Sequence, residues 1–158
     1  MSGVEVSVEL ENSVAWIKLD GRLTLEFGEQ LKAVGQFFLE HGAKSLRIEM
    51  SRCTFMDSTI MGVLAMVALE GYKKSVTVES VNITSEAEEL LTVLGVHKVI
   101  KFISVDVPDI TWKSADEILE VAMNSAIILD AHKTLMDVSD ENVEKFAAVV
   151  KCLENELK

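Results

Sequence analysis

The segment FMDSTIMG, Phe55–Gly62, gathers side chains that could do chemistry directly before an apolar run. Asp57 supplies a carboxylate, and Ser58 and Thr59 supply two hydroxyls. A serine in this setting could be a nucleophile, a neighbour of a metal site, a phosphate acceptor or a helix-capping residue. These roles require different companion residues, and those companions can be sought in the sequence.

The sequence motifs that would support catalysis at Ser58 are missing. No GxSxG surrounds Ser58, and the chain has no P-loop and no GxGxxG. The residue types that most often bind zinc are dispersed along the sequence, without a CxxC: His41, His97, His132, Cys53 and Cys152. We therefore expect a protein that is not an enzyme, with no catalytic residue, no metal site and no cofactor.

Local chemistry leaves two roles open for the motif. Asp57 at the N-cap and hydroxyls in the first turn would satisfy unpaired amides at the start of a helix, an effect of about 0.5–2 kcal/mol. The same position holds Ser58 at the surface, where a kinase could reach it. A phosphate there would add about −1.5 to −2 charges to a docking surface without unfolding anything.

The elements that must position this motif alternate between strand and helix. Short β-branched runs predict five strands, at Val4–Leu10, Val14–Leu19, Ser45–Met50, Ser75–Val81 and Val99–Val105. Helical spacing predicts three intervening helices, capped by Thr24, by the Asp57 motif and by Ser85. The order β-β-α-β-α-β-α-β predicts an α/β fold with a mixed, mostly parallel sheet of about five strands.

Pro108 marks a predicted boundary, so we expect one domain at 1–108 and an extension at 109–158. Two amphipathic helices are predicted in the extension, with too few heptads for a coiled coil. Two such helices need a surface to cover, either on their own domain or on another copy. Their apolar stripes are Ala115, Ile118, Ala122, Ala126 and Leu129, and then Val143, Phe146, Val150, Leu153 and Leu157.

Composition narrows the class of protein further. The 158 residues carry a net charge of −11, which argues against nucleic-acid binding because phosphate contacts require Lys and Arg. No run is long enough for a membrane span, and MSGVEVSVEL lacks the features of a secretion signal. We expect a cytoplasmic protein with reduced thiols.

The order of elements, GRL after the second strand and FMDSTIMGVL opening a buried helix resemble the STAS domain. The resemblance covers residues 4–106 and is closest to the bacterial anti-sigma factor antagonists. NITSEAEELLTVLGVHKVIKF also resembles the last helix, leucine-glycine turn and final strand of that family. The two helices after Pro108 are not part of the minimal family domain.

The resemblance implies a partner-switching regulator of transcription without catalytic activity. The unphosphorylated antagonist would bind a serine kinase that is also an anti-sigma factor, so that the sigma factor is released. The kinase would phosphorylate Ser58, and a metal-dependent serine phosphatase would reverse the modification. Asp57 would help to position Ser58, Thr59 would flank it, and the exposed side of the following helix would supply the docking face.

This sequence departs from the family pattern at two positions. Ile60 stands where the family usually has glycine, although Gly62 is retained, and Thr24 stands where it often has aspartate. Ile60 would add bulk near Ser58, and Thr24 would remove a negative charge. These departures and the extra helices support an alternative, a non-phosphorylated STAS scaffold that forms a homodimer through its C-terminal helices. A lipid- or ligand-trafficking STAS subunit is a further alternative.

Overall fold

The computed structural model describes residues 2–9 and 12–156, which form two compact units, Met1–Asp116 and Glu117–Lys158. The first unit runs past Pro108, and the assignment of 1–108 as domain and 109–158 as extension stays a prediction. Its strands are β1 (Gly3–Glu9), β2 (Val14–Leu23), β3 (Ser45–Glu49), β4 (Cys53–Met56), β5 (Thr77–Val81), β6 (Lys101–Ile103) and β7 (Lys113–Ser114). Its helices are η1 (Leu25–Phe27), α1 (Gly28–Glu40), α2 (Ser58–Lys73), α3 (Ser85–Val93) and η2 (Val96–Lys98).

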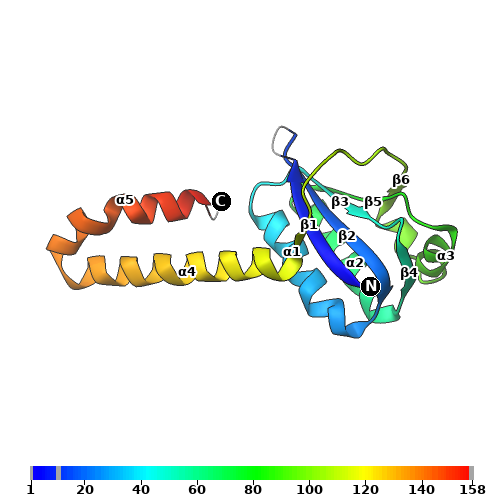
Figure 1. Cartoon of the computed structure of the whole chain (residues 1–158), viewed down its shortest axis with the longest axis horizontal. Helices are drawn as coiled ribbons and strands as arrows, with labels where there is room; N and C mark the ends of the chain where they lie inside the picture. The colour runs from blue at the N-terminus through cyan, green and yellow to red at the C-terminus, as the bar shows by residue number, and fades with distance from the viewer. Residues whose placement is uncertain (1, 10–11, 157–158) are drawn as a thin grey trace. The chain divides into compact units, whose positions relative to one another are not determined.

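The seven strands form a mixed sheet in the order β6-β5-β3-β2-β1-β7, with β4 also paired to β2 (Figure 1). The pairings of β2 with β3, β3 with β5, β5 with β6 and β2 with β4 are parallel. β1 is antiparallel to both β2 and β7. The predicted α/β class and mostly parallel sheet are confirmed, and the two strands that were not predicted, β4 and β7, are four and two residues long.

One face of the sheet is covered by α1 and α2, which pack against each other and against the strands. Apolar spacing sets the buried side of each helix. On α1 it consists of Leu31, Val34, Phe38 and Leu39, and on α2 of Ile60, Met61, Val63, Leu64, Val67 and Ala68. Two glycines lie at close contacts between elements. A Cβ added at Gly35 would lie 2.7 Å from Val67 Cγ2, and one added at Gly71 would lie 2.5 Å from Val78 Cγ2.

The segment that follows β6 covers part of the other face, over Val14, Trp16 and Val81, and crosses the upper end of the sheet in Figure 1 before β7. Trp16 is fully buried in this layer, with the Trp112 ring edge-on at 6.5 Å between centroids. Asn82 anchors the start of the segment, since its side chain donates to Val105 O at 2.8 Å and accepts from Val105 N at 3.0 Å. Residues on both sides of Pro108 therefore belong to the packed sheet layer.

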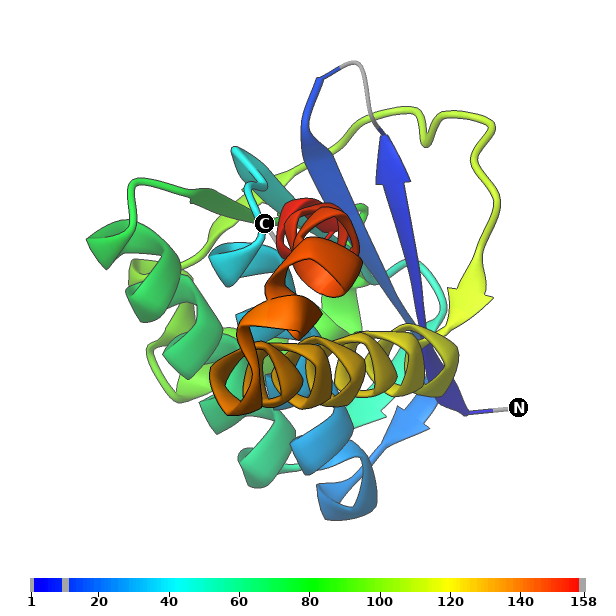
Figure 2. The same cartoon turned by 90° about the vertical axis from the view of Figure 1, so that its left-hand side faces the viewer.

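The second unit consists of α4 (Ala115–Val138) from Glu117 onward and α5 (Asp140–Glu156), two helices that run side by side in opposite directions (Figures 1 and 2). Lys133 Nζ and Glu154 Oε1 join them at 2.8 Å. Leu129 and Val150 are buried, as their predicted stripes require, whereas Val143 is 41% exposed. The side chains at positions 122, 126, 146 and 153, and residue 157, lie outside the described part of the chain.

Candidate functional site

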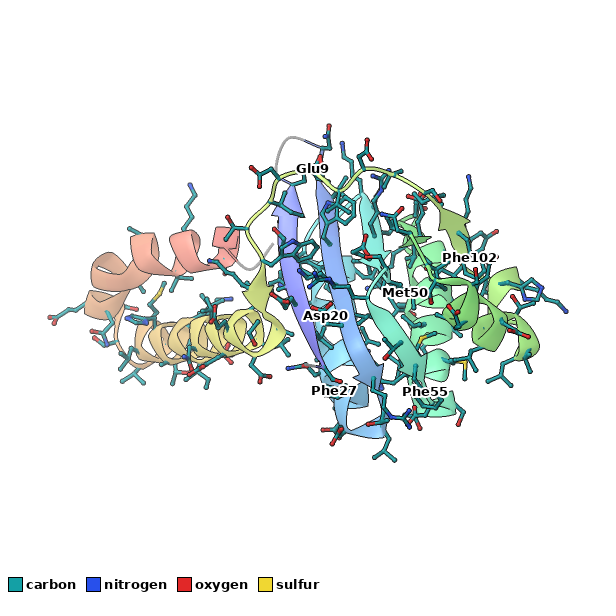
Figure 3. All side chains as sticks on the ribbon, turned by 45° about the vertical axis from the view of Figure 1, so that its right-hand side comes forward. Glu9, Asp20, Phe27, Met50, Phe55 and Phe102 are labelled. Atoms are coloured by element: carbon teal, nitrogen blue, oxygen red, sulfur yellow. The ribbon has the colours of Figure 1, made fainter. Side chains whose placement is uncertain are left out.

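The candidate site is built where β2 and β4 end and the next helices begin. β2 pairs with β3 over Val14–Lys18 and then with β4 from Gly21 onward. The change of partner coincides with a register shift at Gly21, whose φ of 75° suits glycine. As a result, the residues after Leu23 and the residues after Met56 leave the sheet next to each other. Figure 3 shows Phe27 and Phe55 at this end of the sheet, away from Glu9.

Asp57 caps α2, as the sequence predicted. Its backbone is extended, and its Oδ1 accepts a hydrogen bond from Ile60 N at 3.0 Å. This bond satisfies one of the amides left unpaired in the first turn. Ser58 and Thr59 follow as exposed residues. The capping bond therefore comes from Asp57, and the Ser58 hydroxyl does not supply it.

The same carboxylate also holds a second loop, which the sequence did not predict. Asp57 Oδ2 accepts from Leu25 N at 2.6 Å, and Asp57 N donates to Leu23 O at 3.1 Å. Hydrogen bonds to an ionised acceptor are stronger than neutral ones. Asp57 thus joins the end of β2 to the start of α2, across 32 positions of sequence.

The two departures from the family pattern have a simple structural outcome. Ile60 is fully buried, so its bulk lies in the core and not beside Ser58. Thr24 Oγ1 donates to Glu26 Oε1 at 3.0 Å, so the neighbouring Glu26 supplies a carboxylate at this loop. The charge expected to be missing at position 24 is therefore present two residues later.

Thr24 does not cap a regular α-helix. It precedes the 3₁₀ turn η1, and its side chain makes no capping bond. The following Gly28 opens α1 against α2, because a Cβ at Gly28 would lie 3.3 Å from Thr59 Cγ2. The loop after β2 and the first turn of α2 are thus in contact at two points, Leu25 N with Asp57 and Gly28 with Thr59.

These contacts define what we call the Ser58 surface, formed by the exposed residues Leu25, Glu26, Ser58, Thr59 and Gly62. It continues along α2 as an exposed stripe at Met66, Leu69 and Lys73. Leu25 is 70% exposed, and Met66 and Leu69 are about half exposed. A groove between α1 and α2 adjoins the stripe and is also lined by Lys32, Gln36 and Leu39. An apolar surface with a polar rim is typical of a protein-docking face.

Cys53 begins β4 below this surface and is fully buried. Burial raises the pKa of its thiol from 9.0 to about 11, with a smaller contribution from the charge of Asp20, while the hydrogen bond to Phe55 O acts in the opposite direction. Because the thiolate is the reactive form, we expect Cys53 to resist the thiol reagent DTNB at pH 8 in a Cys152→Ser chain. Labelling should begin only when urea unfolds the chain. Rapid labelling of the native chain would contradict this burial.

Other classes of site find little support among the described residues. Across 2–9 and 12–156, no three His, Cys, Asp or Glu side chains are grouped so that they could hold a metal ion. No helix in the described ranges is long and apolar enough to cross a membrane. The buried carboxylate of Glu49 is bound by Ser51 N at 2.6 Å and Asn82 Nδ2 at 3.0 Å, so it has a structural role in the turn after β3.

Comparison with known proteins identifies chains with a similar sequence or fold. The protein family described as "Mlab, STAS domain" matches residues 6–103. The sequence matches none of the curated proteins. Among solved structures, a Thermotoga maritima protein assigned as an anti-sigma factor antagonist is similar to this chain, with a TM-score of 0.57 and 16% sequence identity. The match covers 65% of this chain and 86% of that one.

Two further structures broaden the comparison. Unphosphorylated SpoIIAA, an anti-sigma factor antagonist from Bacillus, has a TM-score of 0.54 and 16% identity, covering 77% of this chain and 98% of that one. A sulfate transporter family protein from Wolinella succinogenes has a TM-score of 0.54 and 19% identity, covering 63% and 82%. At these identities the likeness concerns the fold alone.

Proposed function

Because this chain belongs to the STAS domain family, we propose that it is an anti-sigma factor antagonist that works by partner switching. In its unphosphorylated form it binds an anti-sigma factor that is also a serine kinase. Phosphorylation of Ser58 ends the binding, and a metal-dependent serine phosphatase restores it. The observation that supports this function best is that Ser58 is exposed directly after Asp57. Asp57 caps the helix by itself, so the Ser58 hydroxyl is not needed for the cap.

The physical basis of the switch is a change of charge on a formed surface. A phosphoserine adds about −1.5 to −2 charges at neutral pH. Near Ser58 it would join the carboxylates of Asp57 and Glu26, beside the exposed apolar side chain of Leu25. A partner that covers Leu25 and the α2 stripe would then have to bury an extra dianion, which is costly without cationic partners.

A kinase assay tests the proposal. The partner is isolated by co-purification with this chain from its native host and is then incubated with the chain and ATP. We expect the wild-type chain to be phosphorylated and a Ser58→Ala chain to remain unmodified. Phosphorylation of Ser58→Ala at the wild-type level would reject Ser58 as the acceptor.

Gly62 provides a prediction about the docking face. It lies within α2, it is exposed, and a Cβ there would meet nothing within 4 Å. Gly62→Ala should therefore raise the free energy of unfolding by about 0.5–1 kcal/mol, because alanine is the better helix former. If a partner approaches the backbone here, the same change should weaken partner binding, as measured by calorimetry. A lower free energy of unfolding would contradict the stability argument, and unchanged partner binding would exclude Gly62 from the interface.

The second candidate function is a STAS scaffold that assembles through its C-terminal helices and in which Ser58 is not modified. It is favoured by the separate helical unit at Glu117–Lys158. A ligand- or lipid-trafficking subunit is a related possibility, given the sulfate transporter family protein among the similar structures. In either case Ser58→Glu would leave partner binding unchanged, whereas partner switching predicts that the same substitution weakens it.

A further inference from the structure

The sheet edge formed by β6 is shorter than the strand beside it. β6 stands at one end of the strand order, and Figure 3 shows its Phe102 at that edge. The pairing of β5 with β6 begins at Glu79 and Lys101, whereas β5 pairs with β3 from Thr77 onward. Thr77 and Val78 therefore extend beyond β6, and no described strand lies beside them on that side.

The backbone of β5 shows which residue faces this open side. Thr77 N donates to Lys44 O at 3.3 Å, toward β3, and Asn82 N donates to Ile103 O at 2.9 Å, toward β6. Backbone groups of successive residues point to opposite sides of a strand, so the even-numbered residues face β6. Val78 is the first of them, and its N–H lies beyond the end of β6. An extended segment placed in line with β6 could accept a hydrogen bond from it.

A groove of about 680 Å³ lies at this open side of β5. Its buried lining includes Val76 and Val78, each 8% exposed. Its exposed lining includes Tyr72, at 85%, and Val99, at 40%. Apolar side chains next to an open strand edge are the features of a site where an extended peptide is added to a sheet. We call this site the β5–β6 groove.

The charge of the groove is opposite to that of the chain. Among the described residues that line it, only two carry a charge, and both are lysines: Lys73, the last residue of α2, and Lys101, the first residue of β6. Both are exposed, and neither forms an ion pair within residues 2–9 and 12–156. The chain as a whole has a net charge of −11. A cationic groove on such a chain complements a ligand that carries carboxylates.

We propose that the β5–β6 groove binds an extended acidic segment of a partner protein, in which acidic and apolar residues alternate. The open edge selects an extended backbone, because a helix would offer no free carbonyl to Val78 N–H. Alternate side chains of an extended segment point to opposite sides, so one set can lie against Tyr72 and Val99 while the other reaches the two lysines.

This site is separate from the one proposed for the kinase. Ser58 begins α2 and Lys73 ends it, so the two sites lie at opposite ends of the helix, about 22 Å apart along its axis. Binding in the groove therefore does not depend on phosphorylation of Ser58. A partner held in the groove would leave Ser58 accessible.

Titration of the full chain with a defined peptide tests the proposal. The probe is a seven-residue peptide with blocked ends, in which glutamate and valine alternate. We expect the amide resonances of Thr77, Val78 and Lys101 to shift in ¹⁵N-resolved NMR spectra. Lys101→Glu should weaken binding at least about tenfold, because it places a carboxylate against those of the peptide.

The matched control is Lys98→Glu. Lys98 is also exposed, three residues earlier in η2, and it does not line the groove. The same change of charge there should leave the affinity within about twofold of wild type. Circular dichroism shows whether both variants keep the fold of the wild-type chain.

Two further comparisons test the apolar contact and the sign of the charge. Tyr72→Ala should weaken peptide binding without lowering the free energy of unfolding, because Tyr72 is 85% exposed. A peptide with lysine in place of glutamate should not bind. The proposal would be overturned if the acidic peptide left the Thr77, Val78 and Lys101 resonances unmoved, if the lysine peptide bound equally well, or if Lys101→Glu and Lys98→Glu had equal effects. Ser58→Glu should bind the peptide normally, so this test and the kinase assay can fail separately.

Discussion

Replacing Asp57 by alanine is expected to lower the free energy of unfolding by about 2–5 kcal/mol. The change removes the N-cap of α2, an effect of about 0.5–2 kcal/mol, and the charge-assisted bond to Leu25 N, an effect of about 1.5–3 kcal/mol. Both amides would lose their protein acceptor at once. Urea unfolding followed by far-ultraviolet circular dichroism measures the difference, provided the slope with denaturant is unchanged.

Two further variants test whether the loss of stability comes from the Asp57 carboxylate. Asp57→Asn keeps one carbonyl acceptor but presents an NH₂ group in place of the other oxygen, so it should retain only part of the stability. Asp106→Ala, at an exposed position far along the chain, should change the stability by less than about 0.5 kcal/mol. If Asp57→Ala were as mild as Asp106→Ala, the carboxylate would not join the two loops in solution.

Replacing Ser58 by glutamate is expected to weaken binding to the partner kinase at least about tenfold, or about 1.4 kcal/mol. The new carboxylate stands in for part of the phosphate charge beside Leu25 and Glu26. A negative charge in the first turn of α2 is favourable for the helix itself, so the stability of the chain should not fall. Calorimetry with the co-purified kinase measures the binding, and urea unfolding measures the stability.

The matched control is Ser85→Glu. Ser85 is also an exposed serine at the first position of a helix, α3, so the substitution adds the same charge to the same local structure. It should leave kinase binding within about twofold of wild type, a change below about 0.5 kcal/mol. Equal loss of binding in both variants would point to net charge and not to the Ser58 surface.

Much of the fold follows from local sequence patterns. Alternating runs located five strands, and apolar spacing located the helices, because these signals arise from neighbouring residues. β4 and β7 were not predicted, because strands of four and two residues carry almost no periodic signal. The N-cap of α3 was misplaced by one residue. Thr84, and not Ser85, accepts from Ala87 N at 3.2 Å, and two adjacent hydroxyl residues offer equivalent caps in sequence.

The site was predicted in its local part only. The cap by Asp57 depends on residues three positions apart and could be read from the motif. The bonds of Asp57 to Leu25 and Leu23 join segments that only the sheet brings together, so no local pattern contains them. The inward side chain of Ile60 could have been foreseen, since it shares a helical face with Val63, Leu64 and Val67.

The central claim is that Ser58 accepts phosphate, and phosphopeptide mapping of the chain recovered from its native host tests it most directly. Cleavage after Arg52 and Lys73 releases residues 53–73, which contain Thr54, Ser58, Thr59 and Tyr72. We predict that mass spectrometry will find phosphate on Ser58, in a fraction that falls when the phosphatase is active. Phosphate on Thr54, Thr59 or Tyr72 with none on Ser58, or no phosphate on Ser58 in the chain that is free of the kinase, would contradict the claim.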